Sequence, residues 1–178
     1  AYENRFLESF DYVTASTSRI DRDVQPEKLP VGIEMDFFQP QKEDMFKGET
    51  VIGYSGRMSE KKNIGEIMKL AEKMDEKKFV LVGEGPARKK LERKAPENVE
   101  FRDFLERDDL PGFYSSIDVF LTASTCDTLG LSTLEANACG TPVAAADVPP
   151  FDRTIKEGNG ERFRYGDLDE MKRAVENC

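Results

Sequence analysis

The order of apolar and polar residues predicts strands that alternate with helices from Thr50 onward. Short apolar runs without polar alternation are typical of strands buried on both faces of a sheet. Between them lie segments whose apolar residues recur every three or four positions, as in amphipathic helices. The expected strands are 51–55, 79–82, 99–101, 118–122, 143–146 and 161–165, and the expected helices are 64–74, 87–94, 110–116, 131–139, 151–157 and 168–177.

This alternation predicts an α/β fold with a doubly wound, Rossmann-like parallel sheet. The 178 residues correspond to one ordinary domain with room for a full core. In such sheets ligands bind beyond the carboxyl ends of the strands. The loops that follow the strands are therefore the first place to look for chemistry.

The first part of the chain follows neither pattern. Residues 12–15 are prone to form a strand, 29–33 carry Pro and Gly as in a strand or a crossing segment, and 37–47 resemble a connector. We expect residues 31–178 to form the sheet domain and 1–30 to lie outside it. Ala1 and Cys178 look like internal boundaries of a longer chain.

Composition narrows the classes of function. The formal net charge of -9 disfavours binding to nucleic acid or to an anionic membrane, although a local basic pocket is compatible with it. Cys126, Cys139 and Cys178 have no tight spacing, so they predict neither a disulfide framework nor a zinc site. A reducing, cytoplasmic compartment fits them. The chain has no histidine, which excludes Ser-His-Asp, Cys-His and His-metal chemistry within it.

The loop after the strand 51–55 has the sequence GRMSEKKN, from Gly56 to Asn63. Gly56 allows a sharp turn, and Arg57, Lys61 and Lys62 follow it closely. Cations at the edge of a sheet suit a diphosphate whose negative charge grows as a bond breaks. The alternative is a solvated helix start, but positive charge there opposes the helix dipole.

The turn Gly83–Pro86 after the strand 79–82 resembles the beginning of a dinucleotide fingerprint. Arg88 replaces the third glycine, which normally allows close packing of helix and strand. Asp103 stands where a ribose-binding acid is expected. A tight strand-to-helix turn is the favoured interpretation of this segment, and dinucleotide binding is the alternative.

The segment TCDTLGLSTLEANACGTPVAA carries the strongest signal. Its helix begins near Leu131, so the amides of Gly130, Leu131 and Ser132 can face an anion. Asp127 precedes this helix and Glu135 lies one turn inside it. Two such carboxylates suit sugar hydroxyls, whereas the alternative is acidic capping of the helix. Two D-x-D strings, 21–23 and 167–169, do not follow a buried strand, so we predict no metal site.

Together, GRMSEKKN, VLVGEGP, VEFRDFL, DVFLTAS and DTLGLSTLEANACGTPVAA resemble the C-terminal domain of glycosyltransferase family 4, the group 1 glycosyl transferases of the GT-B fold. The resemblance runs from about residue 29 to the end. It departs from the family in Asp127 for glutamate, Asp103 for a common glycine, and Pro149-Pro150 for a common Gly-Gly turn.

The resemblance implies a role for each matching residue. It implies that Arg57 and Lys62, which follow Gly56, hold the donor diphosphate, and that Asp127 contacts the donor sugar. The remaining residues that it implies are Phe104 and Leu105 at the nucleobase, Gly130, Leu131 and Ser132 at the phosphate and sugar, and Glu135 at the ribose.

The resemblance also implies the reaction and its partners. The expected activity is retaining, metal-independent sugar transfer from a nucleoside diphosphate sugar, with no separate cofactor. Residues 28–40 would be the linker from a missing N-terminal acceptor domain, and residues 1–30 would include its remnant. The nucleotide can be UDP, GDP or ADP, because base contacts in this fold come largely from main chain, and the acceptor can be a lipid at a membrane.

Three alternatives remain at this point. A nicotinamide-dependent oxidoreductase domain is supported by the Gly83–Gly85 turn and Asp103 but leaves residues 127–140 unexplained. A sugar-nucleotide epimerase shares the architecture, although the Glu135 segment matches the transferases better. A non-catalytic regulatory module would not need the Arg57 and Lys62 pair.

Overall fold

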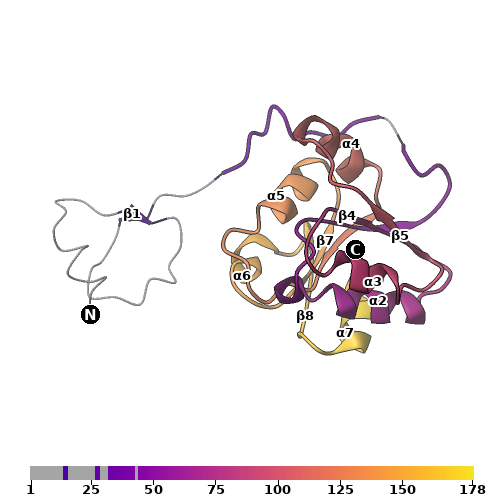
Figure 1. Cartoon of the computed structure of the whole chain (residues 1–178). Coiled ribbons are helices and arrows are strands. Elements are labelled where there is room, and N and C mark those ends of the chain that lie inside the picture. Colours follow the sequence, from indigo (N-terminus) through magenta and orange to yellow (C-terminus); the bar gives the residue numbers. More distant parts are fainter. Residues whose placement is uncertain (1–13, 16–26, 29–31, 43) are drawn as a thin grey trace. The chain divides into compact units, whose positions relative to one another are not determined.

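The computed structural model describes residues 14–15, 27–28, 32–42 and 44–178 (Figure 1). The chain divides into two compact units, residues 1–32 and 33–178. In the first unit, β1 (Thr14–Ala15) pairs in parallel with β2 (Glu27–Lys28). Of the segments predicted there, 12–13, 21–23 and 29–31 lie outside the described residues, and Gly32 and Ile33 have no regular secondary structure. That residues 1–30 belong to an acceptor domain stays a prediction.

The second unit is built on a six-stranded sheet in which every neighbouring pair of strands is parallel. The strand order is β5-β4-β3-β6-β7-β8, which is the doubly wound Rossmann order. The predicted α/β fold is therefore confirmed. The strands are β3 (Val51–Ser55), β4 (Lys78–Val82), β5 (Val99–Arg102), β6 (Val119–Thr122), β7 (Val143–Ala146) and β8 (Gly160–Phe163).

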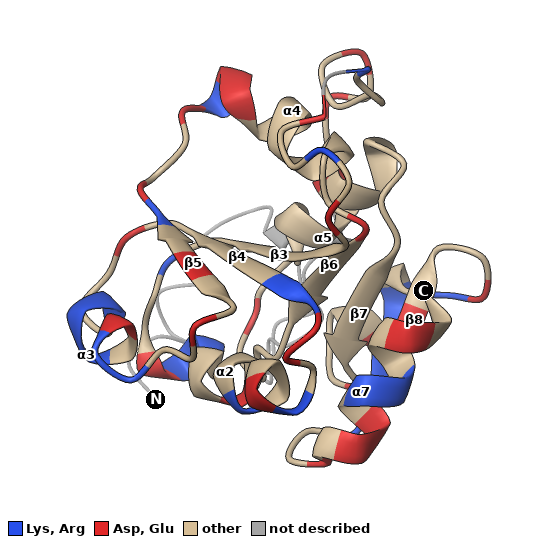
Figure 2. Cartoon of the chain, turned by 90° about the vertical axis from the view of Figure 1, so that its right-hand side faces the viewer, with Lys and Arg blue, Asp and Glu red and all other residues tan. Residues whose placement is uncertain are grey.

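Helices cover both faces of this sheet. Figures 1 and 2 show α2, α3 and α7 on one face and α4 and α5 on the other. Each face encloses its own apolar cluster, which explains why β3, β6 and β7 are buried along their whole length. The helices are α2 (Ile64–Lys73), α3 (Arg88–Glu92), α4 (Leu110–Ser115), α5 (Leu131–Ala138), α6 (Phe151–Thr154) and α7 (Leu168–Asn177).

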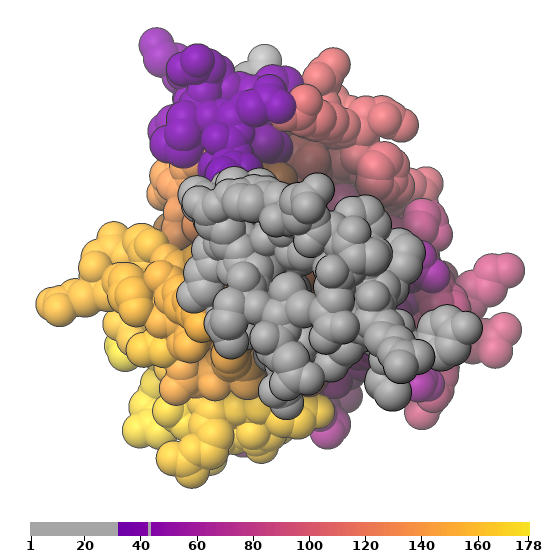
Figure 3. Space-filling view, turned by 90° about the vertical axis from the view of Figure 1, so that its left-hand side faces the viewer, coloured from indigo at the N-terminus to yellow at the C-terminus, as the bar shows by residue number. Residues whose placement is uncertain are grey.

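The segment before β3 packs against the α4 side of the domain. Phe38 and Phe46 insert into the apolar cluster on that face. The amide of Gln41 donates to the Ser115 hydroxyl at 2.9 Å. In Figure 3 this segment, in violet, lies beside the salmon-coloured region that contains α4. The predicted connector is thus anchored to the domain by its aromatic residues.

The predicted element boundaries differ from the structure at several helix ends. The helix predicted at 151–157 stops at Thr154, because the side chain of Asn159 donates to the Thr154 carbonyl at 2.9 Å and accepts from the Lys156 amide at 2.7 Å. These bonds hold the chain in a turn where the apolar pattern favoured another helical turn. Two short 3-10 helices, η1 (Glu60–Lys62) and η2 (Arg107–Asp109), have no apolar periodicity and were not predicted.

The strand order creates the crevice in which a ligand can bind. β3 and β6 are neighbours, and from them the chain winds outward in opposite directions. At such a switch point the loops that leave the two strands diverge and leave a gap.

No helix among the described residues has the length and apolar character needed to cross a lipid bilayer.

One side chain closes the end of α2 and provides a test of the packing. The Asn98 amide nitrogen lies 3.0, 3.1 and 2.9 Å from the carbonyl oxygens of Ala71, Met74 and Lys77. We expect Asn98→Ala to lower the free energy of unfolding by about 1–3 kcal/mol, because it removes a donor that three carbonyls at the end of α2 share. Urea denaturation measures this, with Glu97→Ala at the exposed neighbouring position as the control. Equal stability of the two variants would contradict the assigned role.

Candidate functional site

A cavity of about 550 Å³ lies at the carboxyl edge of the sheet. Loops that follow β3, β4 and β6, the segment after β5, and residues of α4 and α5 line it. The structure brings all ten residues that were predicted for the site to this cavity. They are Gly56, Arg57, Lys62, Phe104, Leu105, Asp127, Gly130, Leu131, Ser132 and Glu135. Their individual roles stay predictions.

Main-chain contacts hold the first two loops together. The Gly56 amide donates to the Val82 carbonyl at 3.1 Å, and the Met58 amide donates to the Glu84 carbonyl at 2.8 Å. Gly83 has φ 130°, and a Cβ there would overlap the Gly56 carbonyl oxygen. The glycines of this turn therefore allow the close approach of two loops, which the favoured interpretation, a tight strand-to-helix turn, did not include.

Lys62 and Asp127 form an ion pair across the cavity. The Lys62 Nζ lies 2.6 Å from Asp127 Oδ2, and both side chains are largely buried. The other carboxylate oxygen of Asp127 accepts from the amides of Thr128 at 3.0 Å and Gly130 at 3.2 Å. The predicted diphosphate cation and the predicted sugar-binding carboxylate therefore contact each other directly.

Glu135 belongs to a buried hydrogen-bonded chain. The Tyr114 hydroxyl donates to Glu135 Oε2 at 2.9 Å and lies 2.8 Å from the Ser55 hydroxyl. Burial raises the pKa of the Glu135 carboxyl above its usual range, and the Tyr114 hydrogen bond and the charge of Arg107 offset this only partly. Burial, together with the Glu135 charge, also raises the pKa of Tyr114, so its hydroxyl stays a donor.

The amino end of α5 faces the cavity through Gly130. This residue is the N-cap of α5 and has φ 65°, a conformation that glycine adopts without strain. A Cβ at this position would crowd Phe151 and Pro150, which places the Pro149-Pro150 loop directly behind the turn. The amides of the first turn of α5 are thus held at the cavity wall, where they can interact with an anion.

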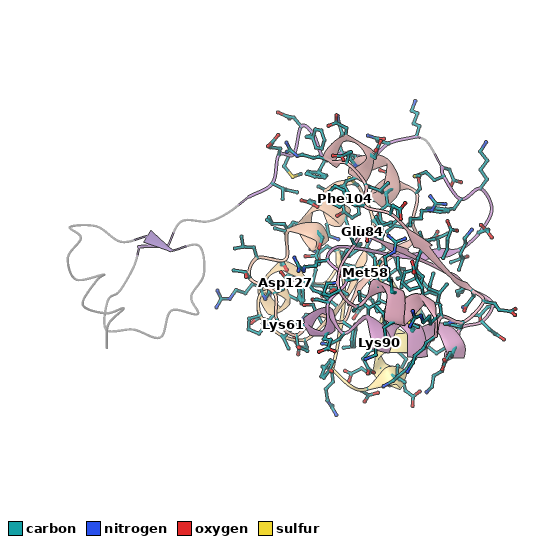
Figure 4. All side chains as sticks on the ribbon, viewed as in Figure 1. Met58, Lys61, Glu84, Lys90, Phe104 and Asp127 are labelled. Atoms are coloured by element: carbon teal, nitrogen blue, oxygen red, sulfur yellow. The ribbon has the colours of Figure 1, made fainter. Side chains whose placement is uncertain are left out.

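The remaining predicted residues lie at the open side of the cavity. Arg57 is exposed, and its guanidinium makes no hydrogen bond or ion pair with the described part of the chain. Phe104 exposes 65% of its surface. In the view of Figure 4, Phe104 lies above Glu84 and Met58, and Asp127 lies to the left of Met58. The Arg57 guanidinium, unpaired among the described residues, and the exposed Phe104 ring lie at the same cavity.

Sequence reasoning missed several polar residues of the cavity. Tyr54, Ser55 and Thr122 lie at or near the carboxyl ends of β3 and β6, and Tyr114 comes from α4. Ser55 and Thr122 carried a usable signal, because a polar residue that ends a buried strand points to the functional edge. Tyr114 carried none, because its spacing was that of an apolar core position.

The Arg88 and Asp103 pair behind the dinucleotide alternative, and the D-x-D string at 167–169, have structural roles. Arg88 pairs with Asp103 at 2.8 Å, and Asp103 does not line the cavity. Asp167 caps α7 by accepting from the Glu170 amide at 2.9 Å, and Asp169 pairs with Lys73 at 2.8 Å. Within the described ranges, no three Cys, Asp or Glu side chains gather as metal ligands would. That the reaction is independent of metal ions stays a prediction.

The family model for glycosyl transferases group 1 matches residues 36–177. The chain belongs to this family. The match covers every predicted site residue and the whole six-stranded sheet. The resemblance inferred from the sequence motifs is therefore confirmed, and neither the oxidoreductase nor the epimerase alternative is favoured.

Curated relatives of this group 1 domain are glycosyltransferases. A 2-deoxystreptamine N-acetyl-D-glucosaminyltransferase of Streptomyces fradiae is 33% identical over 120 residues, which are 61% of this chain and 28% of the relative. An alpha-monoglucosyldiacylglycerol synthase of Streptococcus pneumoniae is 30% identical over 168 residues, which are 82% of this chain and 38% of the relative. The chain thus spans about a third of the length of these relatives.

Solved structures show the same fold. The chain superimposes on a sucrose-phosphate synthase of Thermosynechococcus elongatus with a TM-score of 0.84 and 24% identity, covering 98% of this chain and 50% of that one. A protein of Anabaena in complex with UDP and glucose gives a TM-score of 0.71 and 20% identity, with 83% and 45% coverage. The GT-B type of Rossmann-like domain is therefore confirmed.

The hydrogen bond from the Tyr114 hydroxyl to the Glu135 carboxylate can be tested by its effect on the pKa of Glu135. The hydrogen bond from Tyr114 lowers the pKa of Glu135, so we expect Tyr114→Phe to raise that pKa further above its usual value. Titration of the Glu135 carboxyl carbon by NMR measures this. Tyr165→Phe, which alters an exposed tyrosine, is the control and should leave the titration unchanged. An unchanged or lower pKa in Tyr114→Phe would show that the bond does not act on the carboxylate.

Proposed function

We propose that the chain is the donor-binding domain of a retaining, metal-independent glycosyltransferase that uses a nucleoside diphosphate sugar. One observation carries the proposal. A single cavity at the switch point of the sheet combines two cations, the amino end of a helix and a half-buried carboxylate. This set matches the chemical parts of such a donor, which are a diphosphate, a sugar and a ribose.

The diphosphate would lie between Lys62, Arg57 and the amino end of α5. Lysine and arginine supply formal charge, and the α5 amides supply directed donors. As the bond from the sugar to the diphosphate breaks, negative charge grows on the leaving oxygen. Groups that are already in place stabilise that charge without having to reorganise. In this proposal they take the role that a metal ion plays in metal-dependent transferases.

The nucleoside would occupy the other end of the cavity. Glu135 would accept hydrogen bonds from the ribose hydroxyls, with its carboxylate held by Tyr114. Phe104 and Leu105 lie after β5, at the same cavity, where main chain and the exposed ring can meet a nucleobase. The complex of the Anabaena protein with UDP and glucose supports a uridine nucleotide as the first ligand to test.

The chemistry of transfer would be completed by a second domain. None of the described side chains of this cavity is a convincing sugar nucleophile, so we propose that leaving group and acceptor meet on the same face of the sugar, which retains its configuration. The acceptor would come from an N-terminal domain whose closure excludes water. Cys126, Cys139 and Cys178 are free thiols, which supports a cytoplasmic location.

A ligand screen tests this proposal directly. We expect one of UDP, GDP and ADP to raise the unfolding temperature of the chain and to give a heat of binding, because a ligand that binds only the folded state stabilises it. EDTA should not change the affinity. Stabilisation by NAD(H) alone would refute the transferase assignment, and an affinity abolished by EDTA would refute the metal-independent mechanism.

A pair of neighbouring lysines tests the diphosphate site. Lys62 lines the cavity, whereas Lys61 points to a separate groove along α2 and α3. We expect Lys62→Ala to weaken binding of the nucleoside diphosphate by about 1.5–3 kcal/mol, or roughly tenfold to a hundredfold, because a charged donor is lost. Lys61→Ala carries the same change in net charge and should bind like the wild type. If calorimetry finds equal losses of affinity in both variants, the net charge of the protein and not a direct contact of Lys62 would explain the effect.

A further inference from the structure

The cavity has a charge balance that opposes its proposed ligand. Its charged lining residues are two cations, Arg57 and Lys62, and three carboxylates, Glu84, Asp127 and Glu135. A nucleoside diphosphate brings at least two further negative charges. Like charges in a half-buried site repel, so a carboxylate at the phosphate position opposes binding of the ligand until it moves away.

Asp127 already occupies the contacts that a phosphate would need. One of its oxygens accepts from the Lys62 ammonium at 2.6 Å. The other accepts from the amide of Gly130, the N-cap of α5, at 3.2 Å. An ammonium and an amide at the start of a helix are the groups that bind an oxyanion. The Asp127 carboxylate thus occupies the same position that the proposed diphosphate would take.

Glu135 and Glu84 do not have this position. Glu135 is held by the Tyr114 hydroxyl. Glu84 lies on the outer loop, where it pairs with Arg88. Asp127 is therefore the one carboxylate of the described cavity that competes directly for a phosphate-binding cation.

We propose that Asp127 is the intrinsic counter-ion of the diphosphate site. In the free protein it neutralises Lys62, and the donor diphosphate displaces it. This inference rests on the proposed function and adds that a carboxylate of the protein competes with the diphosphate for Lys62. The displaced carboxylate turns to the sugar end of the cavity when the donor is bound, and it returns to Lys62 when the nucleoside diphosphate leaves. Asp127 therefore lowers the affinity for the product and favours its release.

The competition also gives a specificity for charge. A ligand displaces Asp127 only if its interaction with Lys62 and the α5 amides exceeds that of the carboxylate. A diphosphate carries enough charge and enough oxygen atoms to replace both contacts of Asp127. A nucleoside without phosphate cannot replace either one and leaves the ion pair intact.

Asp127→Asn removes the negative charge that pairs with Lys62 but keeps an oxygen for the turn before α5. An asparagine oxygen can still accept from the Thr128 and Gly130 amides, but it cannot neutralise Lys62. Asp147→Asn is the matched control, because Asp147 forms an ion pair of the same 2.6 Å length with Arg162 away from the cavity. Both variants change the net charge by the same amount.

Calorimetry with inorganic pyrophosphate, the nucleoside diphosphate found by the screen and its parent nucleoside tests the proposal. We expect Asp127→Asn to bind both phosphate ligands about tenfold more tightly, which equals about 1.4 kcal/mol, and to bind the nucleoside as the wild type does. Asp147→Asn should bind all three like the wild type. The gain should vanish when Lys62→Ala is combined with Asp127→Asn.

The outcomes separate this inference from the proposed function. Unchanged or weaker phosphate binding by folded Asp127→Asn, with the wild type binding a nucleoside diphosphate, overturns the counter-ion role alone. Failure of the wild type to bind any nucleoside diphosphate overturns the proposed function, while tighter pyrophosphate binding by the variant would still support the counter-ion. If the variant does not fold, the Asp127 carboxyl resonance of the wild type decides the question. It should shift when pyrophosphate is added, and a fixed resonance in the presence of bound pyrophosphate refutes displacement.

Discussion

The structure depends on the need to bury a parallel sheet on both of its faces. Strands without polar alternation cannot leave either face in water, so the connections between them must place helices on both sides. The chain meets this need by winding outward from β3 in one direction and from β6 in the other. The crevice between these strands is a consequence of that winding. The candidate site residues lie at it because most of them are on loops that follow the strands.

The electrostatics of the crevice follow from its partial burial. Water is excluded from Glu135 and Tyr114 enough to raise the pKa values of both. In the same environment Lys62 is not left as an isolated charge, because Asp127 pairs with it. Pairing lowers the cost of keeping either charge in a partly buried place. The ion pair therefore holds the Lys62 ammonium in place at the wall of the cavity.

The sequence was sufficient to predict the fold, because apolar runs and helical periodicity are local signals that the sheet preserves. It also located ten cavity residues, eight from polar and glycine-rich loops after buried strands and two, Phe104 and Leu105, from the family resemblance alone. The contact between Lys62 and Asp127 was not predictable, because it joins residues separated by 65 positions. Tyr114 escaped notice for a related reason, because a tyrosine on an apolar helix face gives no sign that its hydroxyl reaches a carboxylate. The end of α6 was missed because Asn159 acts through side-chain bonds that periodicity does not record.

The loops after β3 and β4 are joined by main-chain hydrogen bonds, with Ala87 also donating to the Met58 carbonyl at 3.0 Å. Bonds between main-chain atoms do not depend on which side chains the loops carry. Arg57 and Glu84 can therefore be replaced by other residues while the two loops stay joined. Gly83 cannot be replaced, because a Cβ there would overlap the Gly56 carbonyl oxygen. Side chains at these loops, and with them the preference for a ligand, can thus change while main-chain hydrogen bonds keep the loops joined.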